Sequence, residues 1–182
     1  MPFERAGEEN YTPQALFQLD YIPPDPALAS FVTTFYHFRC DEREIRDVQP
    51  AAVGHVLVFL QGEGDMIFEG GRRDRSTLVS LLTPCSRAAP IEVDGPFHCI
   101  GAALSPLGWA ALTGLHAGQW ADRLLPAEQV LGDEVLTLGR DLRHGYLSGH
   151  RTGRELCDQL GAFLAARLRP VNPRHVELMK RM

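Results

Sequence analysis

The pattern of apolar and polar positions divides this chain near residue 104. Before that point, short runs of β-branched and aromatic residues alternate with clusters of glycine, proline and aspartate, which is typical of strands joined by turns. After it, apolar residues recur every three or four positions, as in amphipathic helices. The sequence therefore predicts a β-rich part over residues 1–104 and a helical part over residues 105–170.

The first part predicts short strands with turn residues between them. The run 53–60 is apolar on both faces, as expected for a strand in the wall of a barrel or sandwich. The strands are predicted at 15–19, 31–39, 53–60, 66–69, 77–82, 91–93 and 97–104, and the loops or turns at 21–26, 41–46, 61–65, 70–76, 83–86 and 94–96. Short strands at this spacing predict an antiparallel β-barrel or jelly roll, so the whole chain is expected to belong to the α+β class.

The second part carries strong helix signals. Ser105 and Pro106 form an N-cap followed by a first-turn proline, and Gly114 supplies a stop. Further helical segments are predicted over 117–124, 133–144 (ending at Gly145) and 152–168. The last opens with the capping box Thr152-Gly-Arg-Glu155 and has a broad apolar stripe made of Leu156, Leu160, Phe163, Leu164 and Leu168. Such a wide stripe favours packing against the helix's own domain, with part of it shared with a second copy.

The final residues start another helix that the sequence does not close. Asn172 and Pro173 again form an N-cap and a first-turn proline, and the helical pattern continues to Met182 without a C-cap. We expect the chain to be a piece of a longer protein, with residues 171–182 as a linker and the beginning of a further domain. The alternative is a frayed natural C-terminus.

Composition narrows the class of protein. The 182 residues are 45% hydrophobic and 23% charged, which is ordinary for a globular domain, and the formal net charge of −5 argues against holding a phosphate backbone through bulk charge. Neither a signal-peptide core nor an apolar run of membrane-spanning length is present, so no membrane partner is expected. Four scattered cysteines form no C-x-x-C pair and indicate free thiols in the cytoplasm.

Motifs for catalysis or metal binding are missing from the sequence. The seven histidines form no H-x-H, H-x-x-x-H or H-E-x-x-H pattern, and the chain has no G-x-S-x-G and no phosphate loop before a helix. The basic run Arg72-Arg73-Asp74-Arg75 is interpreted as a solvated hairpin tip. We therefore expect no enzyme, no catalytic residues, no metal and no cofactor.

Three blocks carry a family resemblance. They are Ala27-Leu-Ala-Ser-Phe-Val with Phe35-Tyr-His-Phe; Asp47-Val-Gln-Pro with Gly54-His-Val-Leu-Val-Phe-Leu-Gln-Gly; and Ile100-Gly-Ala-Ala-Leu-Ser-Pro-Leu-Gly-Trp with Leu112-Thr-Gly and 120–132. Together they resemble the N-terminal sensor domain of AraC-type transcriptional regulators, in the branch whose sensor is catalogued only as a domain of unknown function. The resemblance runs from about Leu16 to the end of the chain. The paired helix-turn-helix units that follow in the family are absent from these residues, so DNA would be bound only through a missing C-terminal part.

The resemblance implies a cupin-like barrel that binds a small-molecule effector, followed by a helical subdomain for dimerisation. Family ligand residues are diverse, so the candidates come from strand position: Phe35, His37, His55, Leu57, Phe59, Phe68 and His98. Alternation places His55, Leu57 and Phe59 on one face of their strand. The alternative for each histidine is a core position with a backbone or water partner. The candidate homodimer interface comprises Leu156, Leu160 and Phe163.

Two other functions remain open at this point. A stand-alone cupin-like small-molecule-binding protein or enzyme would need a metal cluster or charged constellation inside the barrel. An interaction module would have a barrel filled by its own side chains.

Overall fold

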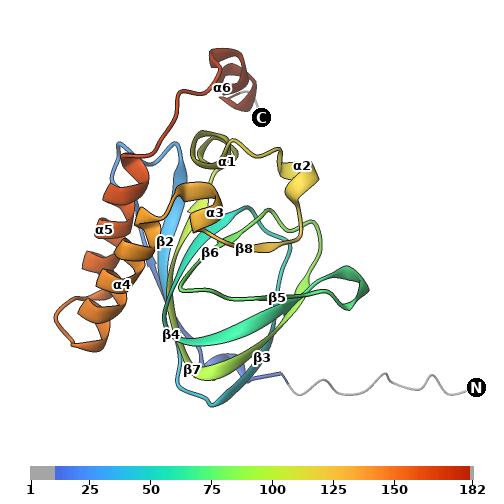
Figure 1. Cartoon of the computed structure of the whole chain (residues 1–182), viewed down its shortest axis with the longest axis vertical. Helices are drawn as coiled ribbons and strands as arrows, with labels where there is room; N and C mark the ends of the chain where they lie inside the picture. The colour runs from blue at the N-terminus through green and yellow to red at the C-terminus, as the bar shows by residue number, and fades with distance from the viewer. Residues whose placement is uncertain (1–10, 181–182) are drawn as a thin grey trace, which may run out of the picture.

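The structure is a computed structural model that describes residues 11–180. It consists of one strongly curved β-sheet with helices against one face and at one end (Figure 1). Two stretches lie outside the described residues, 1–10 and 181–182. The first is where the sequence predicted no signal peptide, and the second is the end of the predicted linker and further domain at 171–182.

The strands and helices follow the division expected near residue 104, with one late strand. The strands are β1 Gln18–Ile22, β2 Val32–Cys40, β3 Glu44–Gln49, β4 His55–Ile67, β5 Arg73–Arg75, β6 Val79–Leu82, β7 Ala89–Leu104 and β8 Leu124–Pro126. The helices are α1 Pro106–Thr113, α2 Ala117–Trp120, α3 Glu128–Leu131, α4 Glu134–Leu147, α5 Gly153–Ala165 and α6 Pro173–Lys180, with short 3-10 turns at Gln14–Leu16 and Glu69–Gly71.

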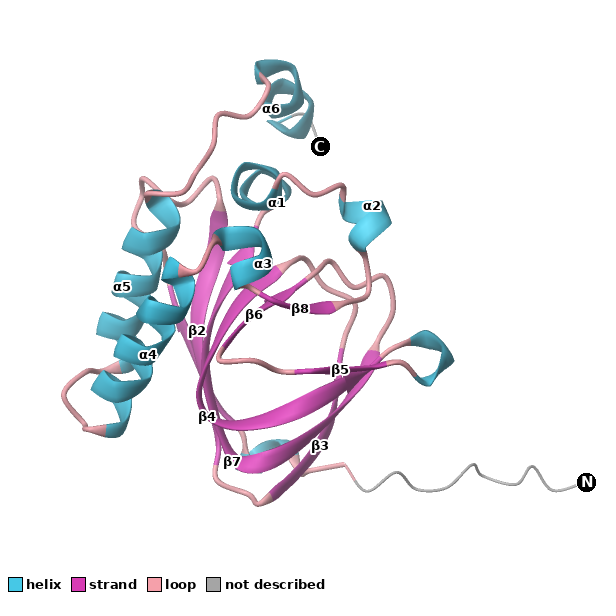
Figure 2. Ribbon diagram, viewed as in Figure 1, coloured by secondary structure: helices cyan, strands magenta, loops and turns pink. Residues whose placement is uncertain are grey.

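The eight strands form one antiparallel sheet. The main path is β1-β2-β7-β4-β6-β8, while β3 pairs with β7 and β5 pairs with β4. The antiparallel sheet and the helical second part were predicted. The predicted barrel or jelly roll is not confirmed: within the described residues β1 and β8 end the path and do not pair with each other, so the sheet is open and curled and not a hydrogen-bonded barrel (Figure 2).

Two predicted turns proved to be irregularities within long strands. The segment 61–65 lies inside β4 and the segment 94–96 inside β7, and the two strands pair antiparallel. Their register shifts here, because β4 advances two residues while β7 advances four, from His98 to Asp94. Gly62 has φ +79°, and a Cβ there would overlap the carbonyl of Pro96. Glycine therefore permits the close approach of two bulged strands at this point, whereas the sequence suggested chain reversal.

Other predicted boundaries also need correction. The charged turn 41–46 overlaps a strand, β3, that pairs along the first half of β7. The first strand lies at 18–22 and not 15–19, and the end of the predicted helix 117–124 is the start of β8. The strand predicted at 66–69 is the end of β4 and the following 3-10 turn.

Local capping signals located most helix starts correctly. The Ser105 side chain accepts the Gly108 N–H at 3.0 Å, and Gly114 closes α1 with φ 65°. Both halves of the capping box of α5 form between Thr152 and Glu155. The predicted end of α4 was wrong, because the helix continues past Gly145 to Leu147. Gly145 therefore lies inside the helix, where the Arg151 side chain occupies the space that a Cβ would need.

The main core lies between the sheet and the helices. Alternate residues of β2, β4 and β7 face α4 and α5, and these helices contribute Leu142, Leu156, Leu160 and Leu164, all fully buried. Trp109 is also buried in this core, against Gly54. The α5 stripe therefore packs within its own domain, as expected, but Leu156 and Leu160 are wrong as interface candidates. Only Phe163 of that set remains partly exposed.

None of the helices in residues 11–180 combines the length and apolar character needed to cross a bilayer.

Candidate ligand-binding cavity

The face of the sheet opposite the helices encloses a cavity of about 380 Å³. This volume lies within the range of small-molecule sites. Its walls come from β1–β4 and β6–β8 and are mostly apolar. The lining residues are Leu19, Tyr21, Thr34, Tyr36, Phe38, Asp47, Val48, Gln49, Pro50, His55, Leu57, Phe59, Gly64, Asp65, Met66, Ser76, Leu82, Ile91, Val93, Phe97, Cys99, Ala103 and Leu124.

One end of the cavity is aromatic. The rings of Phe38 and Phe59 each pack against Phe97, with centroids 5.8 and 5.5 Å apart. These rings come from β2, β4 and β7, which are neighbours in the sheet, so their shared face forms a continuous apolar wall. The exposed Leu19 and Tyr21 on β1 mark the rim where the cavity meets solvent.

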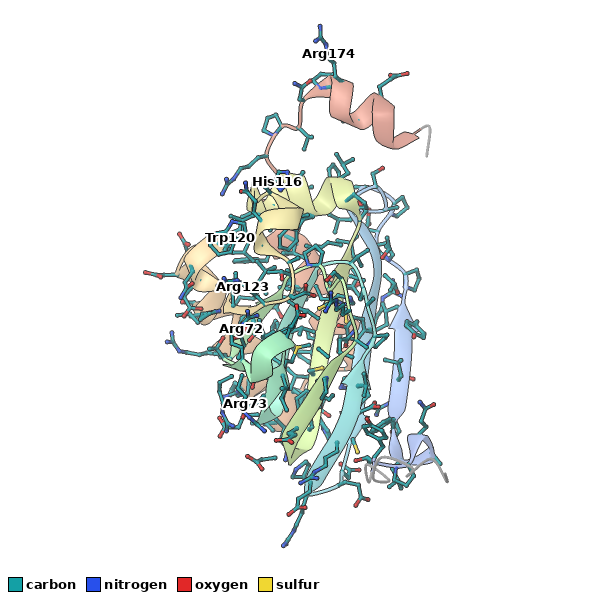
Figure 3. All side chains as sticks on the ribbon, turned by 90° about the vertical axis from the view of Figure 1, so that its right-hand side faces the viewer. Arg72, Arg73, His116, Trp120, Arg123 and Arg174 are labelled. Carbon is teal, nitrogen blue, oxygen red and sulfur yellow. The ribbon has the colours of Figure 1, made fainter. Side chains whose placement is uncertain are left out.

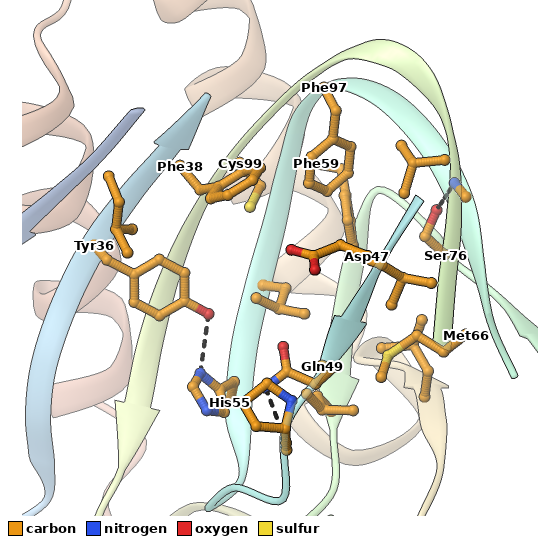
Figure 4. A pocket seen from close by; sticks show the side chains of 18 of the residues that line it. Tyr36, Phe38, Asp47, Gln49, His55, Phe59, Met66, Ser76, Phe97 and Cys99 are labelled. Carbon is orange, nitrogen blue, oxygen red and sulfur yellow. Dashed lines mark hydrogen bonds between the residues drawn. The ribbon is translucent and has the colours of Figure 1, made fainter. Parts of the chain in front are cut away.

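A hydrogen bond between Tyr36 and His55 crosses the floor of the cavity. Oη of Tyr36 lies 2.9 Å from Nδ1 of His55 (Figure 4). Tyr36 is on β2 and His55 on β4, with β7 between them. The Tyr36 ring can cross β7 because its register partner there is Gly101, where any Cβ would overlap the ring. Gly101 therefore determines the geometry of this pair.

Burial sets the protonation of this pair. Desolvation raises the pKa of Tyr36 well above its ordinary value, and it lowers the pKa of His55 to about 4. At neutral pH a protonated phenol therefore faces a neutral imidazole. The phenol O–H donates to Nδ1, which assigns the proton of the imidazole to Nε2. Nε2 makes no hydrogen bond to any residue in the described part of the chain.

Other polar groups reach the cavity from β3 and β4. The Asp47 carboxylate extends from β3 into the cavity, near the amide of Gln49 (Figure 4). Asp65 on β4 lies 3.3 Å from both Arg73 and Arg75, so its charge is already balanced. The Ser76 hydroxyl accepts the Gly64 N–H at 2.9 Å and holds the loop before β6 against the wall.

Three of the seven predicted ligand residues line this cavity. His55, Leu57 and Phe59 share one face of β4, as the alternation predicted, while Val56 and Val58 face the helical core.

Phe35 and His37 lie outside the cavity, on the helix side of β2. Phe35 packs near Gly161 of α5, and His37 packs near Gly153 and against the Tyr146 ring. Burial lowers the pKa of His37 to about 4, and its Nε2 has no hydrogen-bond partner among the described residues.

His98 and Phe68 also lie outside the cavity. His98 links the sheet to α4: its Nδ1 lies 2.6 Å from Oη of Tyr146 and its Nε2 lies 2.9 Å from Asp41. Phe68 packs beneath the Arg72 guanidinium and against a cluster that includes Met66 and Leu82; these two residues line the cavity, but Phe68 does not.

Several cavity residues were not among the candidates predicted from the sequence. Tyr36 and Phe38 alternate with the chosen Phe35 and His37, so the wrong face of β2 was selected. Asp47 and Gln49 were missed because the first half of β3 was predicted as a turn and no strand was predicted over residues 47–49. Residues 44–49 have the sequence Glu-Ile-Arg-Asp-Val-Gln, in which apolar and polar positions do not alternate, so no period-two signal marked this strand.

Metal ligands and thiols also bear on what the cavity can do chemically. Within residues 11–180, no three His, Cys, Asp or Glu side chains gather closely enough to hold a metal ion. Cys99 lines the cavity, but burial raises the pKa of its thiol to about 12, so at neutral pH it is a protonated, weakly nucleophilic group.

A second surface combines basic and aromatic side chains. Figure 3 shows Arg72, Arg73, His116, Trp120, Arg123 and Arg174 on one side of the molecule. Much of this charge is already balanced: Arg72 pairs with Asp74, and Arg73 pairs with Asp65 and Glu92. The predicted solvated hairpin tip is therefore an ion-paired β5 region, with little free charge for an anionic partner.

The fold and the cavity together define a domain in which a curled antiparallel sheet, backed by helices, surrounds a ligand-sized apolar space. The chain belongs to the DUF6597 family: the model described as "Domain of unknown function (DUF6597)" matches residues 20–126. This span includes all the lining residues except Leu19. No curated protein and no solved structure matches the chain.

Proposed function

We propose that this chain is the effector-sensing domain of an AraC-type transcriptional regulator, and that a small molecule binds inside its curled, cupin-like sheet. The cavity carries the proposal, because a mostly apolar space with a few convergent polar groups is the usual form of a small-molecule site. The three sequence blocks that resemble AraC-type sensors support the regulatory role. Each of them includes cavity residues, such as Tyr36 in the first block, His55 in the second and Ala103 in the third.

A sensor must also transmit occupancy to other parts of the protein. A ligand does so only by binding one arrangement better than another. Here the cavity wall is tied to the helical layer. Arg143 on α4 donates hydrogen bonds from Nε and Nη2 to the carbonyl of Phe59, at 3.0 and 2.7 Å. Because the Phe59 ring lines the cavity, a ligand that shifts this residue would act directly on α4.

The remaining elements of the proposal concern partners and location. The protein would act as a cytoplasmic homodimer, with Phe163 as the remaining candidate from the predicted interface. DNA would be bound by helix-turn-helix units that are not part of these 182 residues. Effector binding itself requires only the cavity, so it can be tested on this chain.

Ligand binding is best tested with a cavity-filling variant. A thermal-shift screen of neutral, anionic and cationic metabolites should yield compounds that stabilise the wild-type chain. A ligand at a hundred times its Kd contributes about 2.7 kcal/mol. Ala103→Leu places extra carbon atoms in the cavity and should abolish the stabilisation. The matched variant Ala162→Leu, at an exposed position of α5, should preserve it.

Two results would contradict the proposal. A library of all three charge classes that stabilises neither the wild-type chain nor Ala162→Leu would indicate a cavity without a ligand. Equal stabilisation of Ala103→Leu and wild type would place binding outside the cavity.

A further inference from the structure

The charged side chains that line the cavity are all negative. Among the lining residues that the structure describes there are two carboxylates, Asp47 and Asp65, and no lysine or arginine. The cavity histidine, His55, is neutral at pH 7 because burial disfavours its charged form. The chain as a whole carries a net charge of −5. An anionic ligand would therefore find no cation in the lining.

The two carboxylates are not equivalent. Asp65 is bound by Arg73 and Arg75, which balance its charge. Asp47 makes no ion pair within the described residues. Its Oδ1 accepts the N–H of the adjacent Val48 at 2.8 Å, a local bond that leaves the negative charge unbalanced. Asp47 is also half-buried, so an opposite charge placed beside it is less screened than on an open surface.

Aromatic rings surround the space that Asp47 faces. Phe38, Phe59 and Phe97 form the wall, and Tyr36 crosses the floor (Figure 4). Ring faces attract cations and also provide apolar surface for a carbon skeleton. An unpaired carboxylate inside an aromatic wall is thus complementary to a molecule with a positive charge and an apolar body.

We propose that the cavity takes a small hydrophobic cation, an amine or quaternary ammonium with one ring or a branched alkyl group, whose charge is met by Asp47 and whose body packs on Phe38, Phe59 and Phe97. The cavity limits the ligand to a small molecule, since it holds the liquid volume of roughly a dozen waters. This inference rests on the proposed function, since it presumes that the cavity binds an effector.

The test uses ligands that differ only in charge. A panel of amines is measured against the corresponding alcohols and carboxylates, beginning with 2-phenylethylamine, 2-phenylethanol and phenylacetate. Binding is followed by calorimetry and by thermal shift at pH 7. We expect at least one amine to bind ten-fold or more tightly than its alcohol, and its carboxylate not to bind.

Two matched variants separate a local from a general effect of charge. Asp47→Asn should raise the Kd of the amine at least ten-fold and leave the Kd of the alcohol within two-fold. The asparagine Oδ1 still accepts the Val48 N–H, so the local turn is kept. Glu44→Gln removes the same charge from an exposed position of the same strand and should leave the Kd of the amine within two-fold.

The outcomes distinguish this inference from the function on which it rests. Equal or tighter binding of alcohols or carboxylates would overturn the cationic class while the cavity remained an effector site. Equal losses in Asp47→Asn and Glu44→Gln would overturn the role of Asp47. If no amine in the panel stabilises the chain, the cationic class is wrong, and only a failure of the neutral and anionic compounds as well would remove the sensing function.

Discussion

Arg143 on α4 donates two hydrogen bonds to the main-chain carbonyl of Phe59 on β4. This carbonyl is available because the β4–β7 register shifts after Phe59, where Leu60 is the extra residue. The bulge thus frees an acceptor from the ladder, and a helix side chain satisfies it. This sheet irregularity, at the end of the strand predicted over 53–60, is therefore the point where the cavity wall is joined to the helices.

Replacing Arg143 should therefore weaken the fold. Arg143→Gln removes charge-assisted bonds from a partly buried carbonyl, and we expect a loss of about 1.5–3 kcal/mol in the free energy of unfolding. Arg140→Gln, at an exposed position one helical turn earlier, should change it by less than about 0.5 kcal/mol. Urea denaturation monitored by circular dichroism measures both. Equal stabilities for the two variants would show that the bonds to Phe59 contribute nothing.

Gly101 should tolerate no side chain as long as Tyr36 crosses it. Gly101→Ala places a methyl group inside the volume of the Tyr36 ring, and we expect a loss of about 1–3 kcal/mol from overpacking. In a Tyr36→Ser background the same change should cost much less, so a double-mutant cycle reports the contact. Gly118→Ala meets its nearest atoms only at ordinary contact distance, 3.5 Å, and is the control. An unchanged cost in both backgrounds would contradict the crossing geometry.

The features that were predicted correctly are local ones. The starts of α1 and α5 depend on capping residues within four positions of one another, Ser105 with Gly108 and Thr152 with Glu155. By contrast, turns and bulges use the same residue types, glycine with proline or aspartate, so the sequence does not distinguish between them. Only the partner strand decides between them, and the facing segments 61–65 and 94–96 are far apart in the sequence.

The site was half predicted because both faces of the central strands are apolar. One face of β2 meets the helices and the other meets the cavity, so Phe35, Tyr36, His37 and Phe38 give no polar face that would identify the cavity side. On β4 the predicted face was correct for His55, Leu57 and Phe59. The sequence of β4 was no easier to assign than that of β2. In both strands the helices on one side and the cavity on the other determine which residues face which way.

The two buried histidines should make stability depend on pH. Burial lowers the pKa of His37 and of His55 to about 4 in the fold, below the ordinary 6.5. Between these values the unfolded chain binds protons that the folded chain does not, so stability falls as pH falls from 6.5 towards 4. From pH 7 to pH 5 each histidine should contribute a loss of about 2 kcal/mol.

Denaturant titrations at pH 7, 6 and 5 measure this loss. His55→Gln keeps an acceptor for the Tyr36 hydroxyl and removes the titration, so it should flatten the curve by about half. Constant stability of the wild-type chain over this range would show that both imidazoles are protonated in the fold at their ordinary pKa.

Two residues of the apolar stripe of α5 should have different effects when replaced, Leu160 on folding and Phe163 on association. Leu160 is fully buried against the sheet, so Leu160→Ala should cost about 2–5 kcal/mol in the free energy of unfolding. Phe163 is only partly buried, and the guanidinium carbon of Arg167 lies 3.6 Å from the centroid of its ring, so Phe163→Ala should cost clearly less.

If a second copy covers this part of the helix, Phe163→Ala should also weaken dimerisation at least ten-fold by analytical ultracentrifugation. Leu147→Ala, at an exposed apolar residue at the end of α4, controls for general surface apolarity and should leave association unchanged. An unaltered dimer in Phe163→Ala would move the interface away from α5, because the other two predicted contact residues are already enclosed by their own chain.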